Sequence, residues 1–229
     1  MTQKQMKNII KTLIWMIACV LFTIFAMTFD KKPIAPDGSP VGFGSINDFF
    51  FSIFGAHKVA DVISDIFSVL SIAVALFFTI LGLIQLIKRK NIFKVDMTVI
   101  CMGIVYAITI ALYILFILCP VNMAPYLEDG EATASFPSSH TMTIVAIFLT
   151  AATWVGRKVK NARSAEIITY VLYGSSAVLV IFRLFSGAHW FTDIIGGVIY
   201  AFMLSSLYST LLSLFCVKKK NPKTGRSVK

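Results

Sequence analysis

The sequence predicts an all-α integral membrane protein, with six transmembrane helices and a short interfacial helix between the first two. Two observations lead to this prediction. The 229 residues are 57% hydrophobic and only 14% charged, whereas soluble domains carry about a quarter charged residues. The apolar residues also fall into six long runs, and every second connection between them is rich in Lys and Arg. We therefore expect a single six-span domain over residues 1–229.

Each apolar run approaches the roughly 20 residues that a helix needs to cross a bilayer. The predicted spans are Ile9–Phe29, Ile66–Ile87, Met97–Cys119, Thr141–Val155, Ile167–Phe185 and Trp190–Cys216. The first run follows three lysines, as in a signal peptide, but it is too long and lacks a small-residue cleavage site. We therefore expect it to be a retained span. The fourth run is short and gains a turn if it starts at Ser138.

The placement of the basic residues predicts the orientation. Most of the 21 Lys and Arg lie at the N-terminus, after the second span, after the fourth span and in the tail. Lys31, Lys32, Lys58 and Arg183 are the exceptions. By the positive-inside rule both termini are cytoplasmic, with residues 1–8 and 218–229 as basic tails. The net charge of +10 is thus mostly a topology signal, and nucleic acid is excluded as a partner.

Three segments then fall on the outer side. The proline-rich stretch Asp30–Asp48 is predicted to be a loop, and the five apolar residues within 49–54 to form a short helix in the interface. Pro120–Pro137 is predicted to be an outer loop, and Ser186–His189 a turn.

Polar residues gather at the outer ends of the last three spans. Placing polar side chains in a membrane costs free energy, so these residues are functional candidates. The fourth span opens with Pro137, Ser138, Ser139 and His140, a helix start whose free N–H groups suit an anion. Arg183 ends the fifth span, and a guanidinium binds oxyanions well.

The sixth span adds His189 and, four residues later on the same helical face, Asp193. A histidine with a carboxylate one turn away is a nucleophile or base with an orienting partner. His140 can protonate a leaving group. Together these residues indicate phosphoryl transfer onto and off histidine.

Alternatives remain for these residues. Taken singly, His140 can cap its helix, His189 and Asp193 can form a structural pair, and Arg183 can reach lipid phosphates. A metal site of His140, His189 and Asp193 is also possible in principle, but Arg183 and the helix N-terminus favour an anion. No metal is therefore predicted. The four cysteines lie in apolar runs without C-x-x-C spacing, which indicates neither a disulfide nor a zinc site.

Two further acids, Asp61 and Asp65, lie one turn apart near the outer start of the second span. We expect them to complement the helix dipole. A proton relay is the alternative, and the neighbouring His57 and Lys58 could pair with them.

These motifs resemble those of the type-2 phosphatidic acid phosphatase superfamily, the membrane lipid phosphate phosphatases. Residues 136–140 resemble the P-S-x-H motif, and Arg183-x5-His189-x3-Asp193 resembles R-x5-H-x3-D, with Phe182 at a position that is usually Ser. The resemblance implies that His189 is the nucleophile, oriented by Asp193, and that His140 is the general acid. It also implies that Arg183, Ser138 and Ser139 hold the phosphate, and that no metal or other cofactor is needed.

The first family motif, K-x6-R-P, is degenerate in this chain. Alignment on Pro125 puts Ile117 at the lysine position and Ala124 at the arginine position. Alignment on Pro120 restores neither cation. Lys58, on the same side of the membrane, is the one candidate replacement.

The sequence therefore predicts a metal-independent membrane phosphatase that hydrolyses a lipid phosphate or polyprenyl diphosphate at the outer face. Its partners would be that substrate and the bilayer; the sequence names no protein partner. The alternative is a weak or inactive relative that binds lipid phosphate or a protein.

Overall fold

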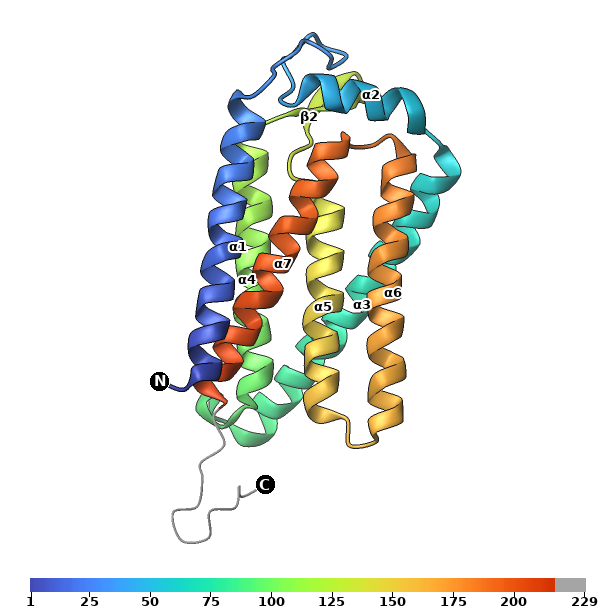
Figure 1. The fold of residues 1–229 in the computed structure, drawn as a ribbon. Coiled ribbons are helices and arrows are strands. Elements are labelled where there is room, and N and C mark those ends of the chain that lie inside the picture. The colour runs from blue at the N-terminus through green and yellow to red at the C-terminus, as the bar shows by residue number, and fades with distance from the viewer. Residues whose placement is uncertain (217–229) are drawn as a thin grey trace, which may run out of the picture.

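The computed structural model describes residues 1–216, and the predicted basic tail at 218–229 lies outside the described residues. It contains six helices that are long and apolar enough to cross a membrane. They are α1 (Gln3–Thr28), α3 (Lys58–Arg89), α4 (Met97–Leu118), α5 (Ser139–Lys158), α6 (Ala162–Ser186) and α7 (Phe191–Phe215). Figure 1 shows them as one bundle, with α2 (Gly44–Phe54) across one end. The predicted multi-pass architecture is confirmed.

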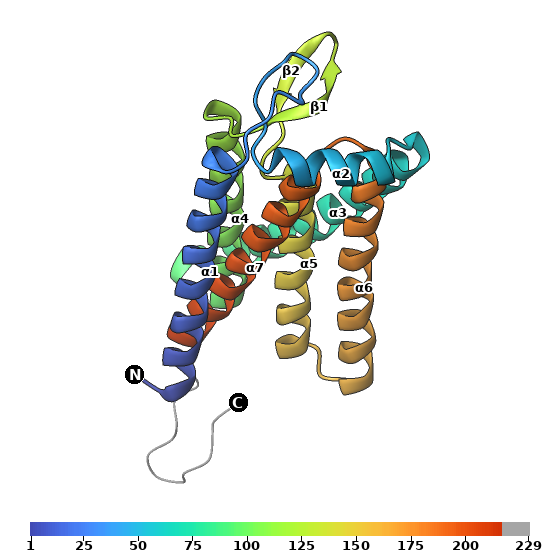
Figure 2. The ribbon, with the colours of Figure 1, turned by 45° about the horizontal axis from the view of Figure 1, so that its top comes forward.

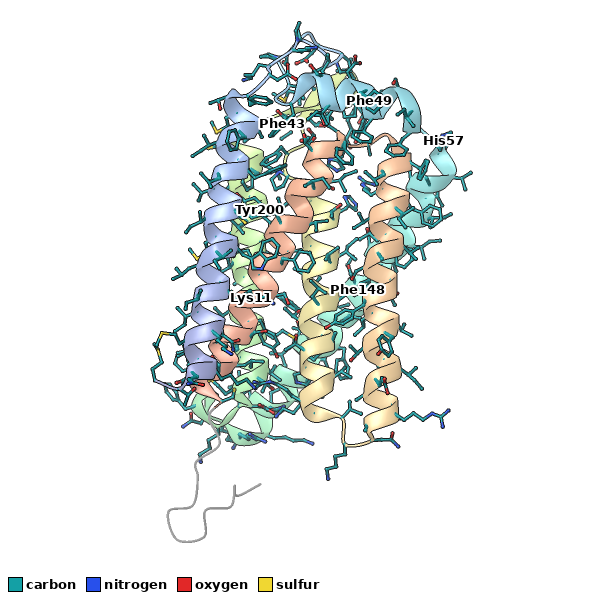
Figure 3. All side chains as sticks on the ribbon, in the orientation of Figure 1. Lys11, Phe43, Phe49, His57, Phe148 and Tyr200 are labelled. Carbon is teal, nitrogen blue, oxygen red and sulfur yellow. The ribbon has the colours of Figure 1, made fainter. Side chains whose placement is uncertain are left out.

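Helices α1, α3 and α6 begin earlier than predicted, and α6 starts at Ala162. Thr2 and Gln5 form a capping box that starts α1 at Gln3, so residues 3–8 are helical and not a separate tail. Lys11, predicted near the start of the span, lies well inside this helix (Figure 3). Helix α3 begins at Lys58, which places Asp61 and Asp65 within it. Charged residues in a first helical turn are compatible with a helix that extends beyond the hydrocarbon core.

The interfacial helix is also longer than predicted, because α2 starts at Gly44 inside the stretch read as a loop. The buried side chain of Asn47 donates to the carbonyl of Gly42 at 2.8 Å and to Thr192 Oγ1 at 2.9 Å. The Phe50 ring stacks on Phe191 with centroids 3.9 Å apart. These contacts fix α2 against the start of α7.

A small antiparallel hairpin lies between α4 and α5, in the segment that the sequence predicts as an outer loop. Strand β1 (Met123–Glu128) pairs with β2 (Glu131–Ala134), and Glu128 faces Glu131 across the ladder. Asp129 and Gly130 both have positive φ at the tip, and Asp-Gly is a strong hairpin signal that the reading missed. The all-α prediction did not include this small hairpin, and the rest of the fold is helical as predicted. Figure 2 shows the hairpin beyond the helix ends.

Helix α7 packs against both α1 and α5, and these contacts form the centre of the bundle. The core includes the fully buried Phe148, Leu204 and Tyr208. Along α1, Thr12 forms hydrogen bonds of 2.9 Å with Ser206 and Thr210. Helix α5 is less hydropathic than the other spans because protein, and not lipid, covers most of it.

The connections between the helices lie at the two ends of the bundle. The N-terminus, the short 3₁₀ helix η1 (Ile92–Lys94) between α3 and α4, and the α5–α6 turn lie at one end. Helix α2, the hairpin and the α6–α7 turn lie at the other (Figure 1). The basic connections among the described residues therefore share one end, and we call the opposite end, which carries α2, the α2 end.

Candidate active site

The start of α5 presents two free backbone N–H groups at the α2 end. Ser138 is the N-cap, and its Oγ accepts from Thr141 N at 3.4 Å and from Thr141 Oγ1 at 3.1 Å. Ser139 and His140 follow as the first two helical residues, which have no carbonyl one turn earlier to accept their N–H groups. Ser138 is fully buried, and its side chain caps the helix, while Ser139 lines the cavity described below.

Helix α7 lies very close to this helix start. Ser138 N donates to the Asp193 carbonyl at 2.9 Å. A Cβ on Gly197 would lie 2.8 Å from the Ser138 carbonyl oxygen, and one on Gly196 would lie 2.8 Å from Phe136. The two glycines therefore allow the backbone contact that brings the motifs of α5 and α7 together.

His189 lies in the short turn between α6 and α7. Its Nδ1 is 3.0 Å from the carbonyl oxygen of Ser135. Burial holds the pKa of His189 well below its usual value of 6.5, the charges of Arg183 and His140 lower it further, and the bond to Ser135 opposes the shift. The imidazole is therefore neutral at pH 7.

Asp193 supports His189 indirectly. Its buried carboxylate accepts from Asn122 Nδ2 at 2.9 Å, from Ser135 Oγ at 2.6 Å and from the backbone N–H of Trp190 at 3.3 Å. Ser135 thus joins the two residues, with its hydroxyl on Asp193 and its carbonyl on His189. Among the described residues no direct hydrogen bond joins Asp193 to His189, and Ser135 provides the link between them.

Arg183 is buried, with 4% of its surface exposed. Its Nη1 donates to Asp61 Oδ1 at 2.8 Å and to Ser64 Oγ at 2.9 Å, and its Nη2 lies 3.5 Å from His140 Nδ1. Arg183 therefore points into the protein and does not reach out to lipid head groups. Asp61 lies in the first turn of α3, as a dipole-complementing acid would, but it also pairs with Arg183, which the sequence reading did not predict.

These side chains border one open cavity of about 560 Å³. Ser139, His140, Arg183 and His189 contribute to its wall, together with residues from the C-terminal part of α4 and from the hairpin. Tyr126 and Glu128 project from the hairpin strand β1. Partial burial and the nearby Glu128 raise the pKa of Tyr126. The structure thus brings four of the six predicted site residues to one cavity, with Ser138 and Asp193 directly behind it.

The two positions of the degenerate motif differ in their surroundings. Ile117 is about half exposed and lines the cavity. Ala124 is buried, with 4% exposure, in strand β1. Only the first of these positions could therefore present a longer side chain to the cavity without repacking.

The residues present do not fit a metal centre. Among residues 1–216, no three His, Cys, Asp or Glu side chains are grouped closely enough to hold a metal ion. The cavity wall instead combines a guanidinium, two imidazoles and a helix N-terminus, a donor set suited to an oxyanion.

The sequence of this region identifies its family. Residues 113–215 match the family model of the PAP2 superfamily. This part of the chain belongs to the PAP2 superfamily. The match covers α5, α6 and α7 with both recognised motifs, and it also includes Ile117 and Ala124. The resemblance stated from the motifs is thus confirmed.

The fold agrees with this PAP2 assignment. The structure is similar to the crystal structure of a transmembrane PAP2-type phosphatidylglycerolphosphate phosphatase from Bacillus subtilis, with a TM-score of 0.65. The similarity covers 90% of this chain and 97% of that chain, at 14% sequence identity. No curated protein shows significant sequence similarity to the chain.

Several residues of the site were not predicted from the sequence. Ser135 adjoins the P-S-x-H motif, so its position was a usable signal. Asn122 and Ser64 are ordinary polar residues whose contacts join distant segments. Asp61 was noticed, but nothing in the sequence pairs it with Arg183, 122 residues away.

Proposed function

We propose that this membrane protein is a phosphatase that hydrolyses a lipid-linked phosphate monoester or diphosphate through a phosphohistidine intermediate. One observation carries the proposal: His189, His140, Arg183 and the start of α5 border a single cavity at the end of a six-span bundle. Each of these groups has a role in phosphoryl transfer, and none depends on a metal.

The hydrogen bond of His189 defines its tautomer. A carbonyl oxygen can only accept, so Nδ1 must carry the proton that it shares with Ser135. Nε2 of the neutral ring then holds a free electron pair. The ring is therefore prepared to attack phosphorus through Nε2.

Arg183 and the N–H groups of Ser139 and His140 supply donors for the phosphate oxygens. Charge grows on these oxygens in the transition state, where preorganised donors contribute most. These groups come from α5 and α6, which pack against each other, and α7 packs closely against the start of α5.

His140 serves as the acid and then as the base. In the first step the His189 Nε2–P bond forms, the bond between phosphorus and the leaving oxygen breaks, and His140 gives that oxygen a proton. In the second step a water attacks phosphorus, His140 takes its proton, and the N–P bond breaks. Inorganic phosphate is the product from a monoester.

A second groove provides a place for the lipid tail. It measures about 310 Å³ and extends from Ser139 and His140 between α3, α4 and α5. Its wall includes Ile72, Ile110 and Tyr113, which are exposed on the side of the bundle. A substrate can thus keep its chain in the membrane while its phosphate reaches His189.

The orientation proposed is that the α2 end faces outward and both termini are cytoplasmic. Cys119 is exposed at the α2 end, and Lys160 is exposed in the α5–α6 turn. In intact cells an impermeant maleimide should label native Cys119, and should not label the variant Cys119→Ser with Lys160→Cys. The reverse pattern would show that the topology is inverted.

Phosphate release from a panel of lipid phosphates in detergent tests the function. His189→Ala should abolish release. His57→Ala is the matched control, because His57 lies at the junction of α2 and α3 (Figure 3) and is not part of the cavity wall. Release that is equal in all three proteins would refute the mechanism. Metal chelation should leave the rate unchanged.

The second candidate is a protein that binds lipid phosphate without turnover. Ile117 and Ala124 favour it, since they occupy the lysine and arginine positions of the first family motif. Each charged hydrogen bond lost there contributes roughly 1.5–3 kcal/mol. A folded protein that binds phosphatidic acid but releases no phosphate from any lipid would establish this alternative.

A further inference from the structure

Helix α3 presents a polar face to Arg183 and His140. Asp61 and Ser64 contact Arg183 Nη1 at 2.8 and 2.9 Å. One turn beyond Asp61, Asp65 Oδ1 lies 3.9 Å from His140 Nε2. Neither recognised motif includes α3, so these contacts add a third element to the site.

The contacts occupy one part of the guanidinium and leave another part available. Nη1 has two hydrogens, and Asp61 and Ser64 provide an acceptor for each. Nε is buried and has no hydrogen-bond partner among the described residues. Nη2 has only the long 3.5 Å contact with His140. Nε–H and Nη2–H form a fork that matches two oxygens of a phosphate.

The start of α3 is itself held against the end of α6. His57 N donates to the Phe185 carbonyl at 2.9 Å. Gly187 caps α6 with φ +70, and a Cβ at this position would lie 2.4 Å from the Cβ of Ala56. The two helix ends are therefore in close contact next to Arg183, so Asp61 and Ser64 are presented from a fixed position.

We propose that Asp61 and Ser64 are positioning residues, which hold Arg183 through Nη1 so that its Nε–Nη2 edge receives the phosphate. This proposal rests on the proposed function for its catalytic consequence. The arrangement is important in this chain because Ile117 and Ala124 replace the other two cations of the family site, which leaves Arg183 as the sole guanidinium in the cavity wall.

Simple electrostatics predicts the opposite sign. A carboxylate close to the phosphate site repels an anion, so its removal should strengthen phosphate binding. A positioning role predicts weaker binding and slower turnover, because Arg183 loses its fixed orientation when Asp61 is removed. The direction of the change therefore separates the two interpretations.

The test compares Asp61→Ala, Asp61→Asn and Ser64→Ala with the native protein. Asp61→Ala should lower kcat/KM by about 10- to 100-fold, mostly through kcat, because charge develops on the phosphate in the transition state. Asp61→Asn keeps an acceptor oxygen and should recover part of the loss. Asp48→Ala is the control, since it removes an exposed carboxylate at the α2 end that does not line the cavity.

A second measurement does not need turnover. Inorganic phosphate should raise the Tm of the native protein and of Asp48→Ala, and should raise that of Asp61→Ala less. The Tm without phosphate shows whether each variant is folded, and Ser64→Ala provides the milder change if Asp61→Ala is not.

The outcomes distinguish the two proposals. If no lipid is hydrolysed even by the native protein, the proposed function fails, and the phosphate-induced change in Tm still tests the positioning role. Unchanged or higher kcat/KM in Asp61→Ala, or an equal or larger response of its Tm to phosphate, would overturn the positioning role.

Discussion

His189 donates its Nδ1 proton to the carbonyl oxygen of Ser135 across 3.0 Å. The hydroxyl of the same Ser135 donates to the buried carboxylate of Asp193 at 2.6 Å. Asp193 therefore orients His189 indirectly, because it holds Ser135, whose carbonyl oxygen binds the imidazole. A carboxylate bound directly to the imidazole would stabilise its cation strongly, whereas a neutral carbonyl does so less.

This link predicts different effects for its two members. Asp193→Ala leaves the buried Asn122 amide and the Trp190 N–H without their acceptor, and each such loss costs about 1–3 kcal/mol. Ser135→Ala keeps the carbonyl on His189 and loses only the hydroxyl. Asp193→Ala should thus lower the Tm markedly and abolish activity, while Ser135→Ala should remain folded with a loss of about tenfold in kcat. Equal Tm values for the two variants would contradict this account.

The pH dependence follows from the lowered pKa of His189. Its neutral form is the nucleophile, and burial keeps that form populated below the usual pKa of 6.5. As the pH falls, protonation of His189 should lower kcat/KM only below pH 6.5, where its lowered pKa is reached. A profile of kcat/KM from about pH 4.5 to 8 reports the ionisation of the free enzyme. A decline in kcat/KM centred at or above pH 6.5 and caused by protonation of His189 would contradict the assignment.

Ile117 is the position where a missing cation can be restored. Its side chain is half exposed and lines the cavity, so Ile117→Lys adds charge near the phosphate site without creating a cavity in the core. We expect kcat/KM to rise by about tenfold, the value of one modest charged contact. Ile117→Met is the uncharged control of similar length, and Ile117→Glu should lower kcat/KM. Ala124→Arg should instead destabilise the protein, because Ala124 is buried in β1.

Gly187 is required by the contact between α3 and α6. It has φ +70, and a Cβ would overlap Ala56. Gly187→Ala should therefore lower stability by about 1–3 kcal/mol, and should reduce activity by shifting α3 away from Arg183. Gly174→Ala in the same helix is the control, since a Cβ there meets nothing within 4 Å. Thermal unfolding in detergent checks both, and equal Tm values would contradict the close contact.

Much of the fold could be predicted because bilayer physics acts on sequence directly. Long apolar runs and alternating basic connections predict six spans, and the six helices are present. The helix boundaries could not be predicted as well. Helix α3, for example, begins at Lys58, about two turns before the apolar run. The hairpin was missed because a short strand pair in a polar connection gives little periodicity, although its Asp129-Gly130 turn was a readable signal.

The site was predictable to the extent that it depends on motifs. His140, Arg183 and His189 were named from their spacing, and the structure brings them to one cavity. The supporting contacts of Asp61 with Arg183 and of Asn122 with Asp193 join residues far apart in the chain. Such pairs depend on how the helices pack, which no local pattern encodes.

The most direct test of the central claim is to trap a phosphoryl group on His189. The native protein, mixed briefly with a radiolabelled lipid phosphate and quenched in alkali, should carry acid-labile, alkali-stable label, as phosphohistidine does. The chain has only three histidines, so His57→Ala should retain the label and His189→Ala should lose it. Label that persists in His189→Ala, or full turnover without His189, would contradict the phosphohistidine mechanism.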